Sequence, residues 1–274
     1  MLTQVNLVGD TTINMNVLGA GPRDSLQVRK ITGLGPPDVD LFMGDYARDG
    51  GVYSGRRVQK RNVVIELGLN PNHGENETVD GLRQSLYKMF LDPSYAGDDL
   101  VIELVDDVHP VRILTGYTEK FEGEVFSRDS MINASLICPD PYMRDAVETV
   151  LTGSYTTFPF TYNGSSETGF YVEVNVTANT DSITIDNNGS KMVFEFDFLI
   201  GDVLKVNTSP GFRSVVVDRS GFPDIEILYA MTSSSPWISL HSQINLLKVY
   251  DAPLTEAIVA SMTKLAYTQT YWGI

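Results

Sequence analysis

Short runs of apolar and β-branched residues, alternating with turn residues, dominate the chain. In the first half they occupy residues 63–67, 100–105, 111–114 and 131–137. Short runs of this composition, bounded by Gly, Pro, Asn and Asp, are typical of strands. The pattern therefore predicts a β-rich first half.

The second half repeats the pattern more densely. Its apolar runs are separated by turn pairs such as Asn163-Gly164 and Asn188-Gly189. Asn-Gly pairs favour tight turns between antiparallel strands. We therefore expect an antiparallel sandwich of two sheets. The strands are expected at 170–176, 182–185, 192–198, 203–206, 214–217, 225–229 and 244–249.

Helical spacing is confined to two segments. Thr78 is placed to cap a helix over residues 79–91, which Asp92-Pro93 would end. Its apolar residues share one face that suits packing on a sheet, namely Leu82, Leu86, Met89 and Phe90. A weaker pattern predicts a second helix over 254–265, since Pro253 suits a first helical turn.

A composition change divides the chain. The strand at 131–137 runs into Cys138-Pro139-Asp140-Pro141, and a polar stretch follows. We predict a first domain over 1–145 of α+β type and an all-β second domain over 146–250. A C-terminal tail over 251–274 would pack back on one of them. The fold class is therefore mainly β.

Composition narrows the function classes. The chain has 274 residues, 42% of them hydrophobic and 20% charged, which suffices for a real core. The net charge of −15 disfavours a sequence-reading nucleic-acid binder, because binding phosphates needs positive charge. No apolar stretch is long enough for a transmembrane helix. The N-terminus lacks the pattern of a signal peptide, so we expect synthesis and folding in a cytosol.

The charge is unevenly distributed. Residues 1–72 carry eight Lys and Arg against seven Asp and Glu, whereas residues 73–274 carry twelve against twenty-eight. Four basic residues lie together, Arg56, Arg57, Lys60 and Arg61. They form either a solvated strand face or a patch that docks on an acidic partner surface.

Motifs for catalysis or cofactor binding are missing from the sequence. The glycines of Gly33-Leu34-Gly35 run into prolines, which cannot open a phosphate-binding helix. The three histidines have no metal-ligand spacing, and no Gly-x-Ser-x-Gly motif occurs. Cys138 follows an apolar strand and is expected to be a buried, inert thiol. We therefore expect no enzyme activity, no cofactor and no metal site.

Several segments, in their order, resemble the distal tail protein (Dit) family of long-tailed, flexible-tailed bacteriophages. In the first half these are 31–37 (ITGLGPP), 48–53 (RDGGVY), 61–65 (RNVVI) and 136–142 (LICPDPY). In the second half they are 160–164 (FTYNG), 200–206 (IGDVLKV), 235–240 (SPWISL) and 271–274 (YWGI). One position departs from the family pattern, because the glycine of the tryptophan motif is Gln243 here.

The resemblance implies a structural virion protein at the distal end of a phage tail, assembled in the host cytoplasm. Six copies would form a ring with a lumen for DNA. The ring would bind the tail-tube protein on one side and the tail-associated hub protein on the other. Side fibres or a receptor-binding protein would attach further out.

The resemblance also implies the fold of each domain. The first would be a tail-tube-like β-fold with one helix and a protruding hairpin, and the second a galectin-like sandwich. We expect the glycine-rich segment 33–55 and the basic residues after it to reach the neighbouring subunit. The expected interface residues are Arg48, Asp49, Tyr53, Arg56, Arg57, Lys60 and Arg61.

Two other functions stay open on the residues alone. A carbohydrate-binding module would use exposed aromatic side chains of the second domain, for which Tyr162, Tyr171 and Trp237 are candidates. Core packing is the favoured role for these rings. A glycosidase would need two carboxylates at a defined separation, and no motif supports one.

Overall fold

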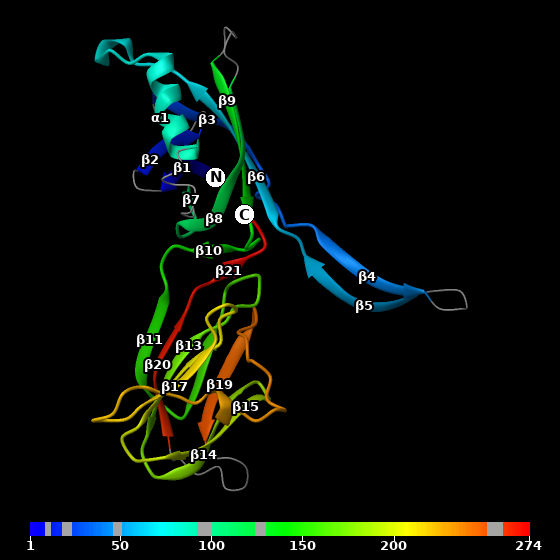
Figure 1. Cartoon of the computed structure of the whole chain (residues 1–274), viewed down its shortest axis with the longest axis vertical. Coiled ribbons are helices and arrows are strands. Elements are labelled where there is room, and N and C mark those ends of the chain that lie inside the picture. The colour runs from blue at the N-terminus through cyan, green and yellow to red at the C-terminus, as the bar shows by residue number, and fades with distance from the viewer. Residues whose placement is uncertain (9–11, 18–23, 46–50, 92–99, 124–129, 251–259) are drawn as a thin grey trace. The chain divides into compact units, whose positions relative to one another are not determined.

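The computed structural model describes the whole chain except residues 9–11, 18–23, 46–50, 92–99, 124–129 and 251–259. The described residues form two compact units (Figure 1). Unit 1 comprises Met1–Ala146 together with Tyr271–Ile274, and unit 2 comprises Val147–Thr270. Unit 2 is therefore inserted into the chain of unit 1.

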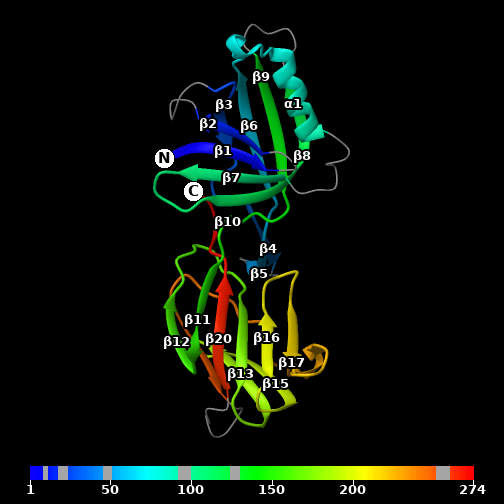
Figure 2. The ribbon, with the colours of Figure 1, turned by 90° about the vertical axis from the view of Figure 1, so that its left-hand side faces the viewer.

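Unit 1 is built on a sheet in the order β21-β10-β8-β7-β1-β2-β3-β6-β9. Because β8 also pairs with β9, the strands from β8 through β7, β1, β2, β3 and β6 to β9 close into a barrel (Figure 2). The bounds are β1 (Leu2–Val8), β2 (Thr12–Val17), β3 (Leu26–Thr32), β6 (Arg61–Leu69), β7 (Leu100–Asp106), β8 (Arg112–Gly123), β9 (Met131–Cys138), β10 (Met143–Asp145) and β21 (Thr270–Tyr271).

The helix α1 (Val79–Leu91) packs on this barrel, as its apolar face predicts. Thr78 caps it through a 3.0 Å hydrogen bond from the N–H of Gly81 to its Oγ1. Leu86, Met89 and Phe90 are buried, and the Phe90 ring lies 5.0 Å from that of Phe121 on β8. A short 3-10 helix, η1 (His73–Glu75), precedes α1.

Between β3 and β6, unit 1 carries a separate hairpin of β4 (Val39–Asp45) and β5 (Gly51–Val58). These two strands form a sheet of their own and pair with no other described strand.

Unit 2 consists of two antiparallel sheets, ordered β11-β20-β13-β16-β17-β18 and β12-β19-β14-β15. Apolar side chains of both sheets meet in one core that includes Phe170, Phe194 and Phe198. The bounds are β11 (Thr149–Tyr155), β12 (Thr157–Thr161), β13 (Tyr171–Val176), β14 (Thr180–Asn187), β15 (Ser190–Phe198), β16 (Val203–Asn207), β17 (Ser214–Asp218), β18 (Ile225–Glu226), β19 (Ile244–Tyr250) and β20 (Ala260–Tyr267), with the 3-10 helix η2 (Leu228–Ala230).

The mainly β class, the helix at 79–91 and the two-sheet architecture of unit 2 are as predicted. The turn at Asn188-Gly189 joins β14 to β15, and both residues have positive φ, 54° and 92°. This backbone matches the twist of the two strands it connects. The run at 225–229 is strand only at Ile225–Glu226, because η2 follows.

The predicted helix at 254–265 is wrong for residues 260–265. Residues 251–259 lie outside the described residues, but Ala260–Tyr267 form strand β20 between β11 and β13. Hydrogen bonds to these two neighbouring strands stabilise the extended conformation, and this outweighs the weak helical pattern of the sequence. The predicted tail thus contributes β20 to unit 2, whereas Tyr271–Ile274 belong to unit 1. In the described parts of the chain, no helix is both long and apolar enough to span a membrane.

Candidate functional site

The β4–β5 hairpin carries most of the residues expected at an interface. Its strands are in register from Val39 opposite Val58 to Asp45 opposite Gly51, with a bulge beyond Phe42. Opposed residues of an antiparallel pair project from the same face. The hairpin therefore has two faces of different composition.

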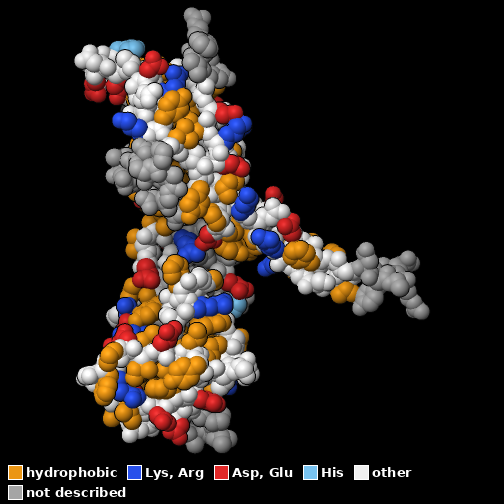
Figure 3. Space-filling model, in the orientation of Figure 1, with side chains coloured by type: hydrophobic (Ala, Val, Ile, Leu, Met, Phe, Trp, Pro, Cys, Tyr) orange, Lys and Arg blue, Asp and Glu red, His pale blue; other side chains and the backbone are white. Residues whose placement is uncertain are grey.

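One face, called here the hairpin apolar face, carries Val39, Leu41, Met43 and Tyr53, with Arg56 opposite Leu41 and Val58 opposite Val39 on the same face. The exposed fractions of the first four are 39%, 57%, 62% and 56%. Scattered exposed apolar residues are normal, but four on one face of an unsupported hairpin form a patch. Figure 3 shows apolar side chains along the hairpin and basic ones near its base.

The predicted basic cluster is split in two. Arg56, Arg57 and Lys60 are exposed, as a docking patch requires. The Arg56 guanidinium lies 5.9 Å from the ring centre of Trp272, which is within cation–π range. Arg48 and Asp49, also expected at the interface, lie outside the described residues.

Arg61 differs from the other three basic residues because it is 3% exposed. Its guanidinium donates hydrogen bonds to backbone carbonyls of its own chain, at Gly33, Gly35, Pro141 and Trp272. It is therefore not available to a partner. Burial lowers the pKa of this guanidinium, and the nearby Cys138 and Asp140 act in the opposite direction.

A signal in the sequence separates Arg61 from its exposed neighbours. Alternate residues of a strand share one face, and Arg61 precedes the buried Val63, Ile65 and Leu67 at a spacing of two. It thus lies on the inward face of β6. Because Arg61 also belongs to the cluster of basic residues at 56–61, its place in the two-residue period of the strand was not recognised.

The aromatic residues proposed for sugar contact in the second domain are engaged within unit 2. Tyr162 is 1% exposed, and its hydroxyl donates to the Ser166 carbonyl at 2.8 Å. The Tyr171 hydroxyl donates to Glu173 at 2.9 Å. Burial and this hydrogen bond raise the pKa of Tyr171. The Trp237 ring packs on the core, with the Arg213 guanidinium 5.2 Å from its centre.

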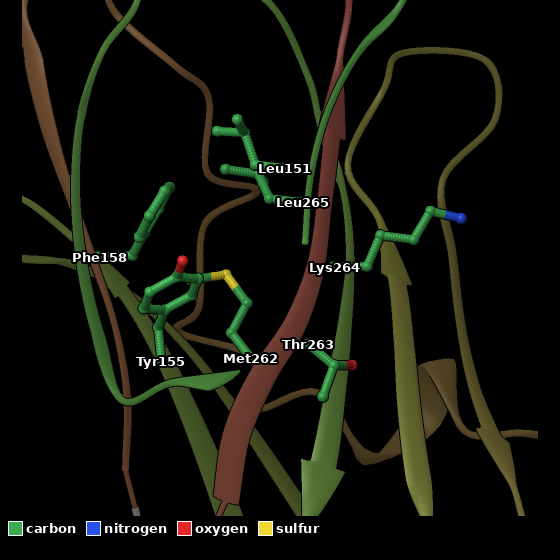
Figure 4. Close-up of a pocket in the computed structure, with 7 residues that line it drawn as sticks. All are labelled: Leu151, Tyr155, Phe158, Met262, Thr263, Lys264 and Leu265. Atoms are coloured by element: carbon green, nitrogen blue, oxygen red, sulfur yellow. The ribbon is translucent and has the colours of Figure 1, made fainter. Parts of the chain in front are cut away.

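The pocket in Figure 4 lies between β11, β12 and β20 of unit 2. Leu151, Tyr155, Phe158, Met262 and Leu265 gather on one side of β20, while Thr263 and Lys264 project from the other. The space is too small to admit a water molecule. It is a packing gap and not a ligand site.

Two titratable groups, Asp106 and Cys138, have shifted pKa values with structural causes. Asp106 ends β7 and accepts from the N–H groups of Val108 and His109 at 2.7 Å each. Burial acts to raise the pKa of Asp106, but these bonds and the His109 ring lower it to about 2. Burial raises the pKa of the Cys138 thiol to about 11, so it is an inert thiol at neutral pH. Within the described ranges, no group of three His, Cys, Asp or Glu is arranged to hold a metal ion.

Comparison with known proteins gives a structural match only. No protein-family model and no curated protein matches the sequence. The structure is similar to that of the SPP1 Dit protein, described as a paradigm of the hub adsorption apparatus in Gram-positive infecting phages. The TM-score is 0.65 at 16% identity, over 90% of this chain and 93% of that one.

Two structures of the phage p2 baseplate in its activated conformation, with Sr and with Ca, match at TM-scores of 0.42 and 0.43. Both are 10% identical, covering 97% and 100% of this chain and 98% and 100% of theirs. Of these structures, the SPP1 Dit protein has the highest TM-score and defines the fold of this chain. The resemblance to distal tail proteins is confirmed at the level of the fold, and this chain has the fold of the SPP1 Dit protein.

Proposed function

We propose that the chain is a distal tail protein of a long-tailed phage, a structural and non-enzymatic component of the virion tail tip. The observation that carries the proposal is the shared fold with SPP1 Dit across 90% of the chain. Because one fold can host several functions, the proposal also needs a surface suited to assembly. The hairpin apolar face is that surface.

The proposed assembly is a closed ring of six copies. An exposed two-stranded hairpin is marginally stable alone in water, so it gains from a partner that covers it. In a ring each subunit presents its hairpin to the next subunit, and the contact closes on itself by rotation. Tyr53, Arg56, Arg57 and Lys60 then lie in the contact. Arg48 and Asp49, which lie outside the described residues, are proposed to belong to the same contact. The copy number follows from the family resemblance.

The remaining partners follow from the same resemblance. One face of the ring would bind the last ring of the tail tube, and the other would bind the hub protein. Unit 2, as a galectin-like sandwich, would lie on the outside and carry side fibres or a receptor-binding protein. The lumen would pass DNA without retaining it.

Light scattering on the purified chain tests the proposal. A six-membered ring of 30.3 kDa chains has a mass of about 182 kDa, and negative-stain images should show a central hole. A chain that stays at 30.3 kDa at every concentration, and does not bind tail tubes assembled from its phage's tube protein, would contradict the proposal.

A further inference from the structure

Backbone carbonyls converge on the buried guanidinium of Arg61. Its Nε donates to Pro141 O at 2.7 Å and its Nη2 to Trp272 O at 2.6 Å. Its Nη1 donates to Gly33 O at 2.7 Å and to Gly35 O at 2.5 Å. Guanidinium is planar and carries its donors in a fixed fork, so these bonds fix the relative positions of the segments.

The bonded segments occupy particular places in the chain. Gly33 and Gly35 lie between β3 and β4, where the hairpin begins, and Arg61 follows the hairpin at the start of β6. Pro141 lies just before the chain leaves unit 1, and Trp272 lies where it returns. Arg61 therefore joins both ends of the hairpin to the departing and returning segments.

The C-terminal segment Tyr271–Ile274 fits closely against the start of the hairpin. The N–H of Ile274 donates to Leu34 O at 3.3 Å. A methyl group added at Gly273 would lie 2.8 Å from Leu34 O and 3.0 Å from the carbonyl carbon of Gly35. Because these neighbours are backbone atoms, they have little room to move aside.

Two ring contacts hold the same segment. The Trp272 ring meets that of Tyr142 edge to face at 5.1 Å between centres. The Arg112 guanidinium lies 4.1 Å from the Tyr271 ring centre. The C-terminal segment is therefore part of the support of the hairpin base, although it is remote from the hairpin in the sequence.

We propose that Arg61 is a positioning residue for assembly, which holds the hairpin base on the C-terminal segment so that the hairpin apolar face meets the neighbouring subunit in one orientation. This inference rests on the proposed ring. A loosened C-terminal segment then releases the hairpin base and weakens the ring without removing any interface side chain.

The test compares Arg61→Lys and Gly273→Ala with the wild type. Lysine keeps the charge but cannot supply the fork of donors. Gly273→Ala leaves Arg61 intact and displaces the C-terminal segment. It therefore tests the support of the hairpin base even if Arg61→Lys folds poorly. Arg213→Lys, an exposed arginine of unit 2, is the matched control.

Hydrogen exchange measured by mass spectrometry reports how firmly the hairpin base is held, and it can be measured whether or not the chain forms a ring. In both variants we expect exchange in peptides covering residues 33–41 and 271–274 to rise at least tenfold, with the core of unit 2 unchanged. Light scattering should show the concentration for half-assembly rising at least tenfold. Arg213→Lys should match the wild type in both.

Unchanged exchange in these peptides would overturn the inference. So would a tenfold rise in exchange that leaves half-assembly at the wild-type concentration, because the hairpin base would then not govern assembly. If the wild type forms no ring and binds no tail tube, the proposed function fails instead. Hydrogen exchange then still decides whether Arg61 holds the hairpin base.

Discussion

Asp202, in the turn between β15 and β16, shows how one charged residue holds a loop of unit 2. Its carboxylate accepts from Arg219 Nε at 2.9 Å and Nη2 at 2.6 Å, and from the Leu199 N–H at 2.9 Å. The Asp202 side chain is 2% exposed and the Arg219 side chain 22%. Burial acts to raise the pKa of Asp202, but the bonds and charge of Arg219 and the Leu199 N–H hold it below its ordinary value.

The lowered pKa of Asp202 makes its contribution to stability dependent on pH. The contribution is complete above about pH 4 and is lost as pH falls through the folded-state pKa. Asp202→Asn should lower the free energy of unfolding of unit 2 by about 2 kcal/mol at pH 7. Urea unfolding should show this difference shrinking below about pH 4. The exposed Asp181→Asn is the control, and an equal loss there would argue against a specific role for Asp202.

Gly33 is a second residue on which local structure depends. Its φ is +85°, and a methyl group added there would lie 1.9 Å from the Asn62 carbonyl oxygen. Gly33→Ala should therefore lower the free energy of unfolding by at least about 2 kcal/mol, measured by thermal unfolding. Gly35→Ala keeps its carbonyl and adds a methyl group with no atom within 4 Å. Equal melting temperatures for the two variants would contradict the expectation.

At the scale of elements, the β4–β5 hairpin is unusual because it is a separate two-stranded sheet that pairs with no other strand the structure describes. Most barrel strands of unit 1 and most sandwich strands of unit 2 bury one face, but no described residue of the hairpin strands is buried. A strand pair of this kind is a template for association with another chain. Its composition is therefore expected to govern assembly more than folding.

Replacing Leu41, Met43 and Tyr53 together by serine tests this expectation. Because all three are more than half exposed, the free energy of unfolding should change by less than about 1 kcal/mol. The 182 kDa species should disappear from light scattering, because the apolar face that the partner covers is gone. Serine at Phe212 and Phe222, exposed at 72% and 66% in unit 2, should leave assembly intact. Loss of rings in both variants would point to general loss of apolar surface.

At the scale of the whole molecule, the net charge of −15 is the property that bears on the proposed passage of DNA through the proposed ring. An acidic surface repels phosphates, whereas a basic one binds them by releasing counterions. The charge therefore suits a channel through which DNA passes without binding.

The assembled protein should not retard linear double-stranded DNA in a gel at about 0.15 M salt, for this electrostatic reason. A basic DNA-binding protein of similar mass, run on the same gel, provides the positive control. Retardation by this protein that weakens as salt increases would show phosphate binding, and the passive-channel interpretation would be wrong.

Much of the fold could be predicted because strands and helices bury one face. The period-two runs at 63–67 and 131–137 became β6 and β9, and the helical spacing after Thr78 became α1. A weak helical pattern did not predict the secondary structure correctly. The segment at 260–265 reads as a helix locally, but its place between β11 and β13 makes it a strand.

For the candidate site, the sequence by itself determined the residue types: a glycine-rich segment, a cluster of basic residues and a tyrosine next to it. Only the tertiary structure decided that Tyr53 is exposed and that Arg61 is buried. Arg61 binds a carbonyl 211 residues away in the sequence. Local periodicity reports which side of a strand faces inward, but not which distant segment supplies the partner of a buried charge. That depends on how the whole chain closes on itself, including the return of its last four residues to unit 1.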